Sequence, residues 1–177
     1  MSKEPRKQTT ESITFRIPSP YIRQLREESK KKQLTLNTLV TQIIREHLDW
    51  HAYAAQAGLF YIPRSTVSLI IDKLTEEEIS ELAITIGRKN VDIGLLLRGE
   101  FTLSSFLNII ENWSRITSFP YKHEVNNGTH NFIIQHDMGK KYSFFITEVF
   151  RNIFEEEFER KLEVTITDNT VVLRFKE

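Results

Sequence analysis

Ser12-Ile13-Thr14-Phe15-Arg16-Ile17 opens the stretch that decides the fold, and it alternates polar and apolar side chains without a break. This period of two predicts a half-buried β-strand. Pro18 ends the strand, because proline has no amide N–H to donate to a sheet ladder. Two short helices are predicted next, one from Pro20 to about Lys32 and one that begins after the capping residue Thr35.

The strand and helices of residues 12–48 cannot form a core by themselves. A single strand leaves both of its edges unpaired, and two short helices supply few apolar side chains. If the strand pairs antiparallel with its copy in a second chain, its apolar residues face the four helices of the two chains. The polar residues Ser12, Thr14 and Arg16 then project outward on a two-stranded ribbon. A ribbon of this kind fits the major groove of B-DNA.

In order and spacing, residues 11–50 resemble the ribbon-helix-helix superfamily of dimeric DNA-binding repressors, the MetJ/Arc type. The matching features are the strand, the proline directly after it, and Leu34-Thr35-Leu36-Asn37 at the start of the second helix. The resemblance implies that Ser12, Thr14 and Arg16 contact bases. It also implies that Thr35, Leu36 and Asn37 hold a phosphate, which suits the free N–H groups of a helix N-terminus. Lys30, Lys31 and Lys32 are either solvated or further phosphate contacts.

The composition of the 177 residues fits one or two domains of a soluble protein, with 40% hydrophobic and 27% charged residues. Cysteine is absent, which excludes disulfides, thiolate chemistry and a cysteine zinc site and is compatible with a reducing cytosol. No apolar run approaches the length of a membrane span, and the N-terminus is polar. We therefore expect a cytoplasmic protein without a membrane partner.

The net charge of zero hides an asymmetry along the chain. Residues 1–57 hold ten Lys or Arg and six Asp or Glu, a net charge of +4, and residues 58–177 carry the balancing −4. The basic half contains the DNA-binding motif. Residues 1–11 are polar and include three cations, so they are expected to be a flexible basic arm before the motif of residues 12–50.

Residues 51–62 are expected to extend the second helix and to link it to a C-terminal domain, residues 63–177. Helices are predicted there from Arg64 to Lys73, from the capping residue Thr75 to Gly87, and after Thr102, whereas residues 90–98 fit either a short helix or a strand.

Two hairpins, which turn at Asn127-Gly128 and Asp168-Asn169, flank a long amphipathic helix that follows Gly139. In the second hairpin, side-chain matching predicts that Val164 faces Leu173 and that Glu163 faces Arg174. The order β-β-α-β-β after a helical lead-in predicts an antiparallel sheet packed on a helix. The fold class is therefore α+β.

Three histidines of the first hairpin, His123, His130 and His136, are predicted to share a mainly apolar face. Imidazoles are suitable ligands for a divalent metal, and the nickel-responsive branch of the superfamily uses histidines on strands. This chain differs from that branch because it has no cysteine ligand and a different order of elements. The alternative is that hydrogen bonds satisfy the three rings in the core or at its rim.

We do not expect an enzyme, because the sequence has no glycine-rich phosphate loop, no G-x-S-x-G elbow and no paired acidic motif with a base. The sequence predicts a dimeric, site-specific transcriptional regulator whose partners are double-stranded DNA and a second copy of the chain. Its C-terminal domain would sense a metal or small-molecule effector, or join dimers into higher oligomers. The alternatives are the antitoxin of a toxin–antitoxin pair and a dimeric scaffold that binds no DNA.

Overall fold

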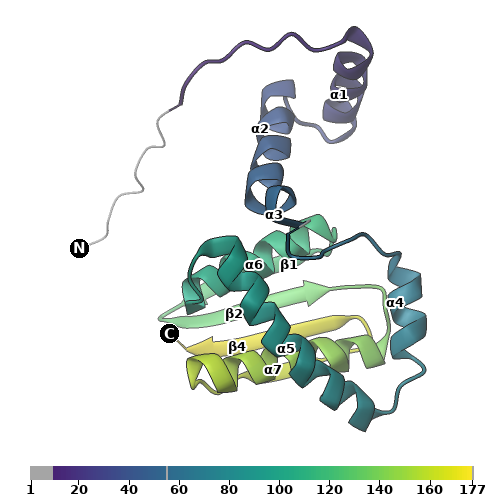
Figure 1. The fold of residues 1–177 in the computed structure, drawn as a ribbon, viewed down its shortest axis with the longest axis vertical. Coiled ribbons are helices and arrows are strands. Elements are labelled where there is room, and N and C mark those ends of the chain that lie inside the picture. The colour runs from purple at the N-terminus through teal and green to yellow at the C-terminus, as the bar shows by residue number, and fades with distance from the viewer. Residues whose placement is uncertain (1–9, 55, 177) are drawn as a thin grey trace. The chain divides into compact units, whose positions relative to one another are not determined.

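The computed structural model describes residues 10–54 and 56–176. The expected flexible arm, residues 1–11, lies almost entirely outside them. The chain forms two compact units, Met1–Ile44 (unit 1) and Arg45–Glu177 (unit 2), and Figure 1 draws the elements of both. The unit that contains the sheet thus begins earlier in the chain than the boundary expected near residue 50.

Unit 1 contains the helix α1 (Ser19–Lys31) and most of α2 (Leu36–Glu46). Thr35 caps α2 as predicted, because its hydroxyl oxygen accepts the amide N–H of Thr38 at 3.1 Å. Leu39 is the one large apolar residue of the described part of unit 1 that is fully buried. The two helices therefore enclose only a small core.

Residues 12–17 form neither a helix nor a strand, so the predicted ribbon is not present in the single chain. A ladder requires a partner strand, and within the described residues this segment pairs with none. Its apolar side chains are uncovered, with 74% of Ile13, 57% of Phe15 and 40% of Ile17 exposed. The missing strand thus has a direct physical reason, the absence of anything to pair with.

Unit 2 begins with the end of α2, a π-helical turn (His47–His51) and the short helix α3 (Ala52–Ala54). The helices α4 (Arg64–Ile71), α5 (Glu76–Arg98) and α6 (Leu103–Ile116) follow. Capping boxes begin the last two, from Thr75 with Glu78 and from Thr102 with Ser105. Both capping threonines were predicted from the sequence.

The prediction that a helix ends at Gly87 is wrong, and residues 90–98 continue the same helix, α5. Gly87 is buried against α7 (Lys140–Phe158), where an added Cβ would lie 3.6 Å from the Cβ of Asn152. Gly87 therefore lies in the interior of a helix that packs against α7, and it does not terminate α5. The helix ends instead at Gly99, which adopts a left-handed φ of 73°.

The four strands β1 (Tyr121–Asn126), β2 (Thr129–Gln135), β3 (Glu163–Ile166) and β4 (Thr170–Lys176) form one antiparallel sheet in the order β1-β2-β4-β3. Val164 lies opposite Leu173 and Glu163 opposite Arg174, which confirms the predicted register. The α+β class with a four-stranded antiparallel sheet is therefore confirmed. The strand pattern differs from the prediction at the N-terminus, where residues 12–17 add no strand.

Helix α7 lies between the sheet and α5, and the core forms on both of its sides (Figure 1). On the sheet side, the ring of Phe154 packs on that of Phe175 in β4, with centroids 4.6 Å apart. On the other side, Ile153 approaches Gly87. Every buried residue of this core comes from residues 71–175, so it belongs wholly to unit 2.

Among the described residues, no single helix has the length and apolar character needed to cross a membrane. Helices α5 and α6 meet those criteria only when taken together, and they are bent by 95° at the break between them.

Candidate nucleic-acid interface, histidine pair and arginine pocket

The predicted base-contacting residues Ser12, Thr14 and Arg16 lie in the segment before α1, and all three are exposed. The apolar residues between them are exposed as well, so the single chain does not separate a buried face from a solvent face. The separation that the alternation predicts would arise only when something covers the apolar half of the segment.

The predicted phosphate-contacting residues lie together at one end of unit 1. Only residues 32–35 separate α1 from α2, so Lys30 and Lys31 in the last turn of α1 lie near the first turn of α2. The hydroxyl oxygen of Thr35 accepts the hydrogen bond of the Thr38 amide. The amides of Leu36 and Asn37, in contrast, have no acceptor within their helix. Lys32 forms an exposed ion pair with Glu28 at 2.7 Å. This end combines cations with free amide donors, which suits an anion.

The structure brings two of the three predicted histidines together. Nε2 of His123 lies 2.9 Å from Nδ1 of His130, and Nδ1 of His123 lies 3.1 Å from a carboxylate oxygen of Glu111. His130 is buried and stacks on the ring of Phe175, with centroids 4.8 Å apart. Hydrogen bonds thus satisfy this pair at the rim of the core.

His136, the third histidine of this face, lies just beyond the end of β2 and has partners of its own. Its Nδ1 accepts the amide N–H of Met138 at 3.2 Å, so its Nε2 donates to the hydroxyl of Ser143 at 2.9 Å. That hydroxyl donates in turn to the carbonyl oxygen of Thr167 at 2.8 Å. Within the described ranges, no group of three or more His, Asp or Glu is arranged to hold a metal.

Burial lowers the pKa of His136, and the negative charge of Asp137 opposes this shift. The neutral ring fits its hydrogen bonds, because a protonated Nδ1 could not accept the Met138 amide. His136 therefore joins the end of β2 to α7 and, through Ser143, to the hairpin of β3 and β4. Its role in the structure is to hold these elements together.

A polar pocket of about 470 Å³ in unit 2 was not predicted from the sequence. It contains three arginines, each in the last turn of a different helix: Arg45 in α2, Arg98 in α5 and Arg115 in α6. The remaining lining residues are polar or acidic, namely Asp49, Glu100, Ser104, Ser105, Asn108 and Asn112. The only sequence signal was a cation at each of three helix ends, and such cations ordinarily serve the helix dipole.

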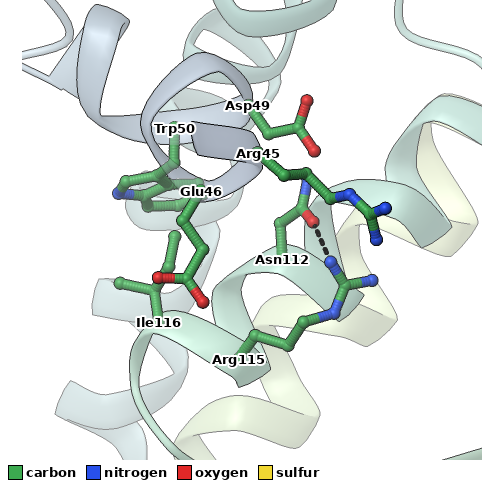
Figure 2. A pocket seen from close by; sticks show the side chains of 7 residues that line it. All are labelled: Arg45, Glu46, Asp49, Trp50, Asn112, Arg115 and Ile116. Carbon is green, nitrogen blue, oxygen red and sulfur yellow. Dashed lines mark hydrogen bonds between the residues drawn. The ribbon is translucent and has the colours of Figure 1, made fainter. Parts of the chain in front are cut away.

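Figure 2 shows the guanidinium groups of Arg45 and Arg115 extending in the same direction, with Asn112 beside them. Arg115 is held in place by Asn112 at 2.8 Å, by Glu111 at 3.2 Å and by the hydroxyl of Tyr121 at 3.0 Å. Burial lowers the pKa of Arg115, but Tyr121 and Glu111 outweigh that effect and raise it. The guanidinium therefore remains charged.

A comparison with known families matches residues 99–176 to AF_0136_C, described as a family C-terminal domain. The match covers less than half of the chain and includes α6, α7 and the sheet. It does not include residues 10–98, which contain the proposed DNA-contacting segment. No curated protein matches the chain.

Proposed function

We propose that the chain is a dimeric, sequence-specific transcriptional regulator that inserts a two-stranded ribbon, made from residues 12–17 of two chains, into the major groove of DNA. The proposal rests on the alternation of polar and apolar side chains in this segment, whose apolar residues Ile13, Phe15 and Ile17 are exposed in the single chain. Such apolar side chains contribute roughly 1.5–3 kcal/mol each when they are buried. A second copy of the segment would supply both the missing ladder partner and the missing cover.

The helices of unit 1 supply further support for a partner. Ile43 and Ile44, near the end of α2, are also exposed, although the periodicity of that helix predicts that they face a core. In an intertwined dimer these residues would pack against the second chain. Ser12, Thr14 and Arg16 would then remain on the outer face of the ribbon, free to contact base edges.

The end of unit 1 that combines cations with free amides supports a role on DNA rather than dimerisation alone. The free amides of Leu36 and Asn37 and the nearby Lys30 and Lys31 offer donors and positive charge to a phosphate. Phosphate contacts position a protein on the duplex, and base contacts provide its specificity. Unit 2 would sense an effector or join dimers, and the regulator would act in the cytoplasm.

The test is selection of bound sequences from random DNA with the full chain, followed by affinity measurements at several salt concentrations. We expect an enriched site with two related halves and an affinity that falls steeply with salt, as phosphate contacts require. Arg16→Ala and Thr14→Ala should weaken binding to that site, by about 1–3 kcal/mol if the contact of Arg16 to a guanine is bidentate.

Arg23→Ala serves as the matched control, because Arg23 is an exposed arginine of α1 outside the ribbon segment. An equal loss for Arg16→Ala on selected and on random DNA would make Arg16 a phosphate contact instead. If no sequence is enriched and no salt-dependent binding is seen, the chain is a dimeric scaffold and the proposal fails.

A further inference from the structure

Two of the three arginine side chains of the pocket in unit 2 have no partner among the described residues. Within the part of the chain that the structure describes, neither the side chain of Arg45 nor that of Arg98 forms a hydrogen bond or an ion pair. The Nε atom of Arg98 is buried and has no hydrogen-bond partner. A buried donor without an acceptor carries a free-energy cost.

The shape of the pocket follows one face of α6. Ser104, Asn108 and Asn112 are spaced four residues apart, so they lie in a row that spans roughly 12 Å at 1.5 Å per residue. Arg98 and Glu100 directly precede the N-terminal end of this row. Arg45 and Arg115 lie beside Asn112 at its other end (Figure 2). Each end of this elongated polar groove therefore carries arginine together with an acidic residue, Glu100 at one end and Asp49 at the other.

We infer that this pocket binds a small, elongated organic phosphate, with its phosphate group between Arg45 and Arg115 and a second anionic group beside Arg98. Arginine donates two parallel hydrogen bonds to phosphate oxygens, and Arg115 is already held in position by three partners. In the first turn of α6 the amide N–H of Ser104 has no acceptor within the helix and is available to the second anion, whereas the amide of Ser105 is bound by the Thr102 hydroxyl. The volume of about 470 Å³ suits a small metabolite.

The remaining lining residues distinguish an organic phosphate from a bare ion. Asn108 and Asn112 lie between the two charged ends, where amide groups donate and accept hydrogen bonds. Asp49 and Glu100 accept hydrogen bonds only, and they suit the hydroxyl groups of a sugar-like ligand. This site would be where the proposed regulator senses its effector. Ligand binding itself does not depend on the proposed function, and only its role in regulation rests on that function.

The test is calorimetric titration of the full-length protein, without DNA, with fructose 1,6-bisphosphate, glucose 6-phosphate, inorganic phosphate and citrate. We expect the bisphosphate to bind more tightly than the monophosphate, and both to bind more tightly than inorganic phosphate or citrate. Arg45→Gln and Arg98→Gln should each weaken the affinity for the bisphosphate by about tenfold or more, because each removes charged hydrogen bonds to it. Neither side chain has a partner in the described protein, so both variants should fold.

Arg88→Gln is the matched control, because Arg88 is an exposed arginine of α5 outside the pocket. The inference is overturned if none of the four compounds binds at millimolar concentration, if citrate binds as tightly as the bisphosphate, or if Arg88→Gln weakens binding as much as Arg45→Gln. Because no DNA is present, a failure of the proposed DNA binding would not change the result.

Discussion

Unit 1 and unit 2 both expose some large apolar side chains, but only unit 2 encloses a large core. In unit 1, Ile13, Phe15, Ile17, Ile43 and Ile44 are exposed. In unit 2, a continuous core surrounds α7, with Phe132 and Phe154 at 0% exposure. A segment that leaves its apolar face open gains little from folding alone, whereas an enclosed core is stable within one chain. This difference is what the proposed dimer requires, because only unit 2 encloses a large apolar core within a single chain.

The largest effect on the difference between the two units is expected from a charged substitution among the apolar residues of the ribbon segment, residues 12–17. In a dimer, Phe15→Glu would remove two buried rings, a loss of about 3–6 kcal/mol before the cost of burying carboxylates is added. We expect sedimentation equilibrium to show a dimer for the parent chain and a monomer for the variant. Unit 2 should remain folded.

The tryptophan fluorescence gives the readout for unit 2, because Trp50 and Trp113 both lie within it. Thr14→Glu, one position away on the polar half, is the matched control and should leave the dimer intact. A parent chain that is monomeric, or a control that dissociates as readily as Phe15→Glu, would contradict the two-faced ribbon.

The converse test weakens unit 2 and leaves unit 1 unchanged. Phe154 contacts the rings of Phe106, Phe158 and Phe175, and it is fully buried. Phe154→Ala should lower the free energy of unfolding of unit 2 by about 3–5 kcal/mol, measured by urea titration of the tryptophan fluorescence. The mass in solution should remain that of the dimer. Dissociation of the dimer in step with this unfolding would show that unit 1 depends on unit 2.

A third expectation concerns pH and affects unit 2 through His136. Its folded-state pKa is lowered from 6.5, chiefly by burial, so the unfolded chain binds the proton more readily. The free energy of unfolding should be level above about pH 6.5 and should fall as the pH drops below it. Urea midpoints between about pH 8 and pH 5 should therefore decrease, and His136→Gln should flatten that decrease.

His47→Gln provides the comparison for this experiment, since His47 is exposed. Its slope against pH should match that of the parent chain. If His136→Gln leaves the slope unchanged, other groups carry the pH dependence.

The sequence predicted the features that depend on neighbouring residues. The alternation in Glu163–Ile166 and Thr170–Lys176 defined the register, because a shift of one residue would expose Val164 and Leu173. The capping residues Thr35, Thr75 and Thr102 were recognisable because their hydroxyls act only three residues along the chain.

Features that depend on distant residues were missed. The sequence predicts a helix end at Gly87, because its packing partner on α7 lies far along the chain. His136 follows the alternation of its strand, but its ring is bound by the turn that comes after it. The pocket arginines Arg45, Arg98 and Arg115 share no motif, and only the fold brings them together.

The smallest expected effect on stability comes from adding a methyl group at the two buried glycines of α5, Gly87 and Gly94, which should respond differently. A Cβ on Gly87 would lie in ordinary contact with α7, at 3.6 Å or more from its neighbours. Gly87→Ala should therefore raise the free energy of unfolding by up to about 0.5–1 kcal/mol, because alanine favours the helix interior. A Cβ on Gly94 would lie 2.6 Å from the ring of Phe101, so Gly94→Ala should destabilise by about 1–3 kcal/mol. Urea titrations of both variants give the comparison, and an equal loss for the two would mean that α5 and α7 pack more tightly at Gly87 than their contact distances indicate.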